Sequence, residues 1–136
     1  MKASATLQFV VVVALLAFIL VPSTLKGQAA TINDAKSALK VGNSRELSQY
    51  FHKQVELNID GEKSNYSRTQ AEFVLKDFFR DFPPVNFEYI HQGASREGLK
   101  YTIGKYSYEG GSFRVYMLIK QFDGQFLIDT IDFTKE

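Results

Sequence analysis

The chain has 136 residues, of which 16 are basic and 15 acidic, and it contains no cysteine. The absence of cysteine excludes disulfides, a lipid-modified cysteine and a thiol nucleophile. Lys and Arg are spread along the chain, which argues against nucleic acid and against a membrane surface as partners, because both select a clustered basic face. No P-loop, dinucleotide or serine-hydrolase motif is present, so we expect no cofactor.

Residues 1–29 have the layout of a secretory signal peptide. Lys2 supplies the positive charge, residues 7–21 form the apolar core, and Gly27 and Ala29 are the small residues before a cleavage site. The apolar run is shorter than the roughly 20 residues of a membrane-spanning helix. We therefore expect export to the periplasm or the medium, with cleavage after Ala29 and no membrane contact afterwards. A retained N-terminal anchor is the alternative.

Removal of these 29 residues leaves residues 30–136, which is enough for one domain with a single core. Two of the basic residues, Lys2 and Lys26, belong to the removed segment, so the remaining charge is close to balanced. All seven Tyr and ten of the twelve Phe follow the signal. This aromatic content predicts a well-packed core more than an aromatic-lined cavity.

Two helices are predicted at the start of this domain. Residues 31–43 place apolar side chains on one face, and Gly42 can close the helix in the left-handed conformation. Ser44 can cap a second, short helix over residues 45–51.

A strand and a third helix follow. Residues 55–60 alternate apolar and polar side chains, which is the period of a half-buried strand. After Gly61 and a turn, Ser67 and Gln70 form a capping-box pattern at the start of a helix that reaches Phe82. The two prolines that come next end this helix.

The rest of the chain is typical of antiparallel sheet. Four apolar-alternating segments are separated by turn residues: 85–93, 99–108, 112–122 and 125–133. Asp123-Gly124 is the strongest turn signal, because a two-residue type I′ hairpin needs positive φ at both positions.

The order of these elements resembles the nuclear transport factor two superfamily, the cone-shaped α+β fold of ketosteroid isomerase and of polyketide cyclases of the SnoaL type. More narrowly, VGNSRELSQYF, YSRTQAEFVLKDFF, HQG and FRVYMLIK are similar to an exported family of unknown function that is typical of the Bacteroidota. The resemblance covers nearly all of residues 30–136. It implies three N-terminal helices on a curved, mostly antiparallel sheet in the order α-α-β-α-β-β-β-β, and it supplies no catalytic residues.

The last hairpin predicts two apolar faces. With a two-residue turn, one face carries Phe113, Val115, Met117, Ile119, Phe126, Ile128, Thr130 and Asp132. The other face carries Arg114, Tyr116, Leu118, Lys120, Leu127, Asp129, Ile131 and Phe133. Helices can cover only one of them. The second face is apolar in its middle with charges at its edges, so we expect a homodimer packed sheet to sheet. A strongly curled sheet that covers this face itself is the alternative.

Few residues are candidates for chemistry. Asp132 is predicted on the face of Val115 and Met117, where it could act as a general base with Tyr106 as an oxyanion donor. His91, on a strand, could transfer a proton, although a structural histidine is the simpler interpretation. Neither His91 nor His52 has a metal-binding spacing, so no metal site is predicted.

Three functions remain open. The favoured one is an exported non-catalytic binding or structural module whose cone either holds a small apolar ligand or is filled by side chains. The second is a small-molecule isomerase, cyclase or hydrolase. The third is a protein-interaction or inhibitor domain of the cystatin-like kind that uses the open sheet face. The fold alone does not decide among them.

Overall fold

The computed structural model describes residues 27–95 and 97–136. This part of the chain has three helices: α2 (Gln28–Val41), α3 (Ser44–Ser48) and α4 (Arg68–Asp81). Its six strands are β1 (Phe51–Ile59), β2 (Glu62–Ser67), β3 (Pro84–Ala94), β4 (Lys100–Tyr108), β5 (Gly111–Phe122) and β6 (Gln125–Lys135). The predicted signal peptide lies almost wholly outside the described residues.

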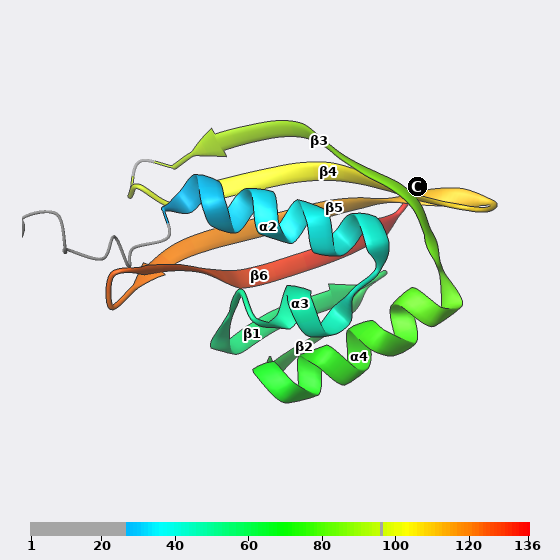
Figure 1. The fold of residues 1–136 in the computed structure, drawn as a ribbon, viewed down its shortest axis with the longest axis horizontal. Coiled ribbons are helices and arrows are strands. Elements are labelled where there is room, and N and C mark those ends of the chain that lie inside the picture. The colour runs from blue at the N-terminus through cyan, green and yellow to red at the C-terminus, as the bar shows by residue number, and fades with distance from the viewer. Residues whose placement is uncertain (1–26, 96) are drawn as a thin grey trace, which may run out of the picture.

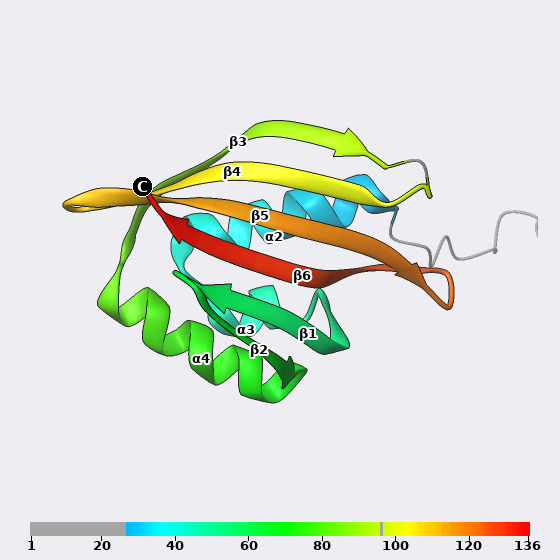
Figure 2. The same ribbon diagram turned by 180° about the vertical axis from the view of Figure 1, so that it is seen from behind.

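The strands form one sheet in the order β2-β1-β6-β5-β4-β3. Every neighbouring pair is antiparallel except β1 and β6, which run parallel. Figure 1 shows the three helices on the near side of this curved sheet, and Figure 2, from behind, shows the strands in front. The predicted α+β cone with a mostly antiparallel sheet is confirmed. We call the helix-covered side the inner face and the opposite side the outer face.

The local signals act as the sequence predicts at both ends of α4. Ser67 Oγ accepts a hydrogen bond from the backbone of Gln70, and the Gln70 side chain accepts one from the backbone of Ser67. The helix ends at Asp81, directly before Phe82 and the two prolines. At the end of α2, Gly42 adopts φ 69° and its N–H donates to the last turn.

The sheet has one more strand than predicted. β2 occupies the segment expected to be a turn, and it pairs with β1 through a hairpin at Asp60 and Gly61, whose φ angles are 48° and 94°. β2 is an exposed edge strand of mostly polar side chains, so no apolar alternation marks it in the sequence. The second helix is also shorter than predicted, because Phe51 begins β1.

A β-bulge in β6 separates the two ends of this strand. Ile119 pairs with Ile128, but the next residue of β5, Leu118, pairs with Thr130, so Asp129 is an extra residue. Side chains alternate between faces, and one extra residue exchanges the faces beyond it. Consequently Ile131 and Phe133 are fully buried on the inner face.

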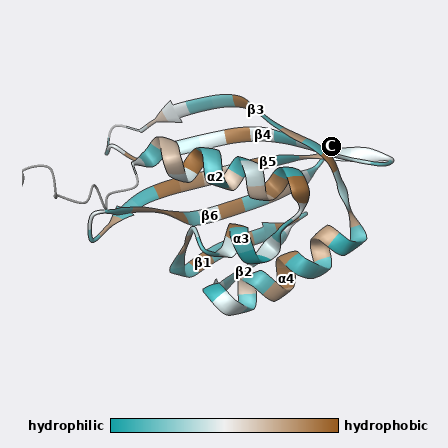
Figure 3. Ribbon diagram, in the orientation of Figure 1, coloured by the Kyte–Doolittle hydropathy of each residue, from teal (hydrophilic) through white to brown (hydrophobic). Residues whose placement is uncertain are grey.

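The interior between α4 and the sheet is filled by aromatic rings. The Phe78 ring centroid lies 4.5 Å from that of Phe133, 5.1 Å from that of Phe113 and 5.5 Å from that of Tyr106. Phe87 packs on Gly104, where a Cβ atom would come within 2.5 Å of the ring. Figure 3 shows hydrophobic positions recurring along the helices and strands that enclose this core. An aromatic cluster of this size contributes much of the folding free energy.

Tyr106 belongs to this cluster and is fully buried. Its hydroxyl donates to the backbone carbonyl of Phe82, next to the end of α4. Burial raises the pKa of the Tyr106 phenol far above the ordinary tyrosine range, because the ionised form would lose its hydration. The Tyr89 phenol, which donates to the Ile32 carbonyl at 2.6 Å, has its pKa raised for the same reason.

Deletion of Asp129 is expected to abolish cooperative folding. Without the extra residue, either Ile128 or the pair Ile131 and Phe133 must leave the inner face, and each such side chain loses about 1.5–3 kcal/mol of burial. The control Asp129→Ala keeps the bulge and removes two contacts of the side chain: the ion pair with Lys120, which is worth about 0–1 kcal/mol, and the hydrogen bond from Thr130 Oγ1. Thermal unfolding followed by circular dichroism compares the stability of the deletion variant with that of Asp129→Ala. If the two are equally stable, the proposed role of the bulge is wrong.

Tyr106→Phe is expected to lower stability near neutral pH and to reduce the loss of stability in alkali. The lost hydrogen bond costs about 0.5–1.5 kcal/mol. Above about pH 10 the unfolded chain releases the Tyr106 proton while the folded chain retains it, so this residue makes stability fall as the pH rises. Urea unfolding near neutral pH and above pH ~10 measures both effects. Tyr116→Phe on the outer face is the control, and equal alkaline slopes for wild type and Tyr106→Phe would contradict the expectation.

Candidate functional site

The three candidate catalytic residues do not meet. Tyr106 is on the inner face with its hydroxyl already bonded to the Phe82 carbonyl, so it is not directed at a substrate. Asp132 lies beyond the bulge and pairs with Tyr116, on the outer face. The prediction that Asp132 shares a face with Val115 and Met117 is therefore wrong, because the prediction assumed an unbroken register. The sheet itself separates the proposed base from the proposed oxyanion donor.

His91 is exposed and stands apart from both. A bulge in β3 between Tyr89 and His91 turns His91 away from the inner face, and its Nε2 atom lies 3.1 Å from the Tyr101 hydroxyl. The Tyr101 ring occupies the space above Gly93, where a Cβ atom would come within 2.4 Å of the ring. In the HQG segment, the first and third residues thus hold Tyr101 in place, which is a structural role.

His52, the other histidine, stacks on Phe122, with ring centroids 3.6 Å apart. Among the described residues no group of three His, Cys, Asp or Glu side chains could hold a metal ion. The same residues include no helix that is both long and apolar enough to cross a membrane.

Three cavities lie near the edges of the inner layer. The first, about 310 Å³, lies between the start of α2 and the ends of β3 and β4. The second, about 190 Å³, lies between α2 and α3, and the third, about 480 Å³, lies between the end of α4 and the β4–β5 turn. Asp132, His91 and Tyr106 line none of these three cavities. A converging set of acid, base and oxyanion donor is the arrangement that an enzyme of the predicted type needs, and these residues do not form it.

The outer face of the sheet is left open by the described helices. Its apolar part lies on β4 and β5, where Tyr101 pairs with Leu118 and Ile103 pairs with Tyr116. We call these four residues the outer patch. All four are half-buried in the single chain, and the rings of Tyr101 and Tyr116 stack with centroids 6.4 Å apart. The helices lie on the opposite face, so they do not cover the outer patch.

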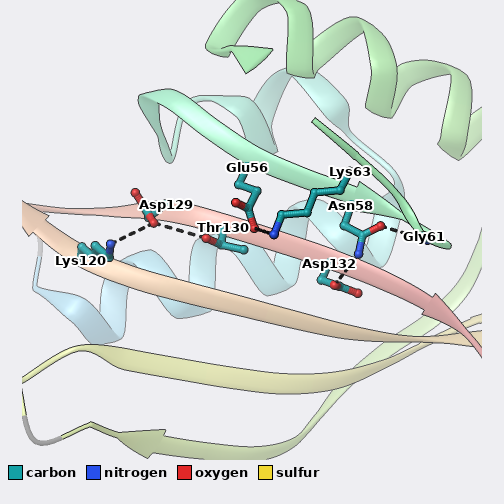
Figure 4. A network of polar contacts seen from close by, with 8 residues as sticks. All are labelled: Glu56, Asn58, Gly61, Lys63, Lys120, Asp129, Thr130 and Asp132. Carbon is teal, nitrogen blue, oxygen red and sulfur yellow. Dashed lines mark hydrogen bonds and ion pairs between the residues drawn. The ribbon is translucent and has the colours of Figure 1, made fainter. Parts of the chain in front are cut away.

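Polar groups on β1 and β6 continue this face. Asp132 accepts hydrogen bonds of 2.8 Å from both Asn58 Nδ2 and Thr134 Oγ1. Glu56 pairs with Lys63 at 3.2 Å. Figure 4 shows the Asn58–Asp132 and Glu56–Lys63 contacts across the strands, together with the Lys120–Asp129 ion pair of 3.1 Å. This half of the outer face is internally hydrogen-bonded, and Asp132 is a carboxylate whose two hydrogen-bond donors are both neutral.

A pair of cations closes one end of the outer patch. Lys105 and Arg114 are direct cross-strand partners, both exposed, and neither makes an ion pair with another described residue. On its other side Lys105 pairs with Glu88 of β3, but the Glu88 carboxylate is in ion pairs with Lys36 and Lys40. Like charges directly opposite each other destabilise a sheet unless an anion approaches them. The outer face therefore carries an apolar centre, a basic end and an uncompensated carboxylate.

The predicted dimer face is corrected in two positions. Ile131 and Phe133 lie in the core, again because of the bulge. Six of its residues remain partly or fully exposed: Arg114, Tyr116, Leu118, Lys120, Leu127 and Asp129. Sequence reasoning missed Tyr101, Ile103 and Lys105 on β4, although their alternation with the buried Thr102, Gly104 and Tyr106 could have indicated them.

Comparison with known proteins gives a family but no activity. A family model described as "Domain of unknown function (DUF4783)" matches residues 32–134. Three solved structures of DUF4783 proteins are similar. The protein from Bacteroides ovatus has 31% identity, TM-score 0.71, and coverage of 76% of this chain and 93% of that chain. The protein from Bacteroides uniformis has 28% identity, TM-score 0.72, and coverage of 76% and 95%. The protein from Bacteroides fragilis has 28% identity, TM-score 0.71, and coverage of 76% and 96%.

More distant structures share the fold alone. An NTF-2 like protein of unknown function from Silicibacter pomeroyi has 14% identity and TM-score 0.55, with coverage of 79% of this chain and 92% of that chain. No curated protein matches the chain. The match over most of the chain, together with the shared fold, shows that this protein belongs to the DUF4783 family, a family of NTF2-like fold whose function is unknown.

Proposed function

We propose that this protein is an exported, non-catalytic binding module that self-associates through the outer face of its sheet. The single observation that carries the proposal is the half-buried outer patch on a face that none of the described helices covers. A filled interior supports a binding role over catalysis, because the rings of Phe78, Phe113 and Phe133 occupy the space where a substrate would enter the cone. The same packing argues against a small apolar ligand at that place.

A second copy of the chain fits the outer face chemically. The outer patch is apolar, and two such patches can bury each other, with a gain of roughly 25 cal/mol for each Å² of apolar surface removed from water. The face also carries both signs of charge: Lys105 and Arg114 make no ion pair within the described part of the chain, and neither does Asp132. A self-complementary surface of this kind is what a two-fold interface requires.

The enzymatic alternative lacks a site. An isomerase, cyclase or hydrolase would need Asp132 or His91 beside a substrate pocket with Tyr106, and the three residues lie in different surroundings. The interaction or inhibitor alternative would use the same outer face with a different protein. It becomes the better account if the protein does not self-associate.

Disruption of the outer patch is expected to give a monomer. We expect a dimer for wild type by native mass spectrometry and light scattering, and a monomer for the double variant Tyr116→Glu, Leu118→Glu, because four charges would be buried in each dimer. Phe73→Glu is the matched control, since Phe73 on α4 is 61% exposed and lies away from this face. Arg114→Glu is expected to weaken the dimer at low salt. If the wild-type protein is a monomer at high protein concentration, the proposal is wrong.

We also propose export. Cleavage after Ala29 would remove none of the buried residues of α2, since Thr31 and Ile32 are the first of these. Expression of the full chain in a bacterial host, followed by fractionation and N-terminal sequencing, is expected to give soluble protein outside the cytoplasm that begins at Ala30. A Leu15→Arg, Leu16→Arg control should block export by breaking the apolar core. Full-length protein in the membrane fraction would favour the retained anchor instead.

A further inference from the structure

The cavity of about 480 Å³ at the end of α4 has a lining that suits a cation. Its walls are two aromatic rings, two carboxylates and the apolar residues between them: Asp81, Phe82, Pro83, Pro84, Val85, Tyr108 and Glu109. Figure 1 shows how the chain leaves α4 there and rises past the C-terminus to become β3. The cavity lies on neither the outer patch nor the filled interior, so its role is separate from self-association.

Three features contribute negative charge around this cavity. The carbonyl groups of the last turn of α4 carry the negative end of the helix dipole. Pro83 and Pro84, which follow the helix, have no N–H to donate to them. Asp81 and Glu109 then add two carboxylates at a helix end that already disfavours negative charge.

The carboxylate charge of the cavity is only partly compensated. Asp81 Oδ1 lies 3.3 Å from Arg80 Nε, and Arg80 also pairs with Asp77 at 3.1 Å, so one arginine is shared by two acids. Glu109 is exposed and has no ion pair or hydrogen bond within the described part of the chain. Arg80 and Lys135 do not line the cavity, although Lys135 Nζ lies over the ring of Phe82, one of its walls.

The aromatic rings add a second means of binding a cation. The Phe82 and Tyr108 rings meet edge to face, with centroids 5.0 Å apart and an interplanar angle of 66°. The chain's own Lys135 Nζ lies 5.7 Å from the centroid of Phe82, which shows that an ammonium group approaches this ring within cation–π range. Two rings, two carboxylates and a helix C-terminus around one cavity therefore favour an organic cation with an alkyl stem.

We propose that this cavity binds a lysine or arginine side chain of a partner polypeptide. β3 begins at Pro84 and is the last of the described strands in the sheet, so within the described residues one of its edges has no strand partner. Val85, the extra residue of a bulge between Pro84 and Asn86, is 70% exposed and also lines the cavity. An extended peptide segment can add to such an edge through backbone hydrogen bonds and place alternate side chains in neighbouring pockets. A basic side chain of that segment would have its stem against Val85 and its charge between Asp81 and Glu109.

The test is a titration of ¹⁵N-labelled purified protein with two capped heptapeptides of alternating Thr and Val. One peptide has lysine at its centre, and the other has norleucine, which keeps the stem and lacks the charge. The lysine peptide is expected to shift the backbone amide signals of Val85 and Glu109 saturably and to bind several-fold more tightly than the norleucine peptide. The difference should shrink as salt is added, because the attraction is between partly exposed charges.

Two variants assign the binding to this cavity. Glu109→Gln changes an exposed side chain and is expected to remove most of the preference for lysine over norleucine. Tyr108→Leu is expected to weaken lysine-peptide binding about two- to fivefold, the loss of one cation–π contact at an exposed site. Glu62→Gln, an exposed acid on the opposite edge strand β2, is the control and should leave both affinities unchanged.

Two results would overturn the proposal. Equal binding of the two peptides, or no shift with either, would show that the cavity does not select a cation. Titration with tetramethylammonium chloride tests whether the cavity prefers a free small cation to the side chain of a polypeptide. If it shifts the same amide signals with an affinity equal to that of the lysine peptide, the cavity is a site for a free small cation and the polypeptide partner is wrong.

Discussion

The single extra residue in β6 decides how this protein divides its side chains between core and surface. β6 is a central strand, parallel to β1 on one side and antiparallel to β5 on the other, and Asp129 has no partner in β5. Because the side-chain period of a strand is two, the bulge directs Ile131 and Phe133 inward and leaves Asp132 outward. The contact between Phe133 and Phe78 depends on this change of register at Asp129. The packing of α4 on the sheet depends on it too.

The inner and outer faces of the sheet carry different kinds of side chain. Inward, aromatic rings fill the space under α4, and the buried Tyr106 uses its hydroxyl to hold the chain as it leaves that helix. Outward, tyrosine, leucine and isoleucine on β4 and β5 lie beside a hydrogen-bonded polar network on β1 and β6 (Figure 4). An enclosed site with converging acid and base groups is absent from this arrangement. Among the described residues, the outer patch and the cavity beside Phe82 and Tyr108 are the surfaces at which we propose binding.

Local signals of the sequence were read correctly where a residue type has one strong conformational preference. The capping box at Ser67, the left-handed Gly42 and the stop before Pro83 all form as predicted. Asp123-Gly124 forms its turn with φ angles of 49° and 80°. The same dipeptide at Asp60 and Gly61 forms an equivalent turn, and it was the available signal for β2. That strand was missed because its polar residues gave no apolar alternation beyond the turn.

The sequence by itself determined the α+β class and the order of its helices and strands apart from β2, and these depend on local periodicity, capping and turn residues. The cone-shaped fold was implied by the family resemblance, and an uncovered sheet face followed from the two apolar faces of the last hairpin. Only the tertiary structure decided which residues that face carries. Asp129 has no local property that marks it as a bulge, and its place is set by the requirement that Ile128, Ile131 and Phe133 all reach the same core. The cavity beside Phe82 and Tyr108 is likewise tertiary, since it joins segments that lie far apart in the chain.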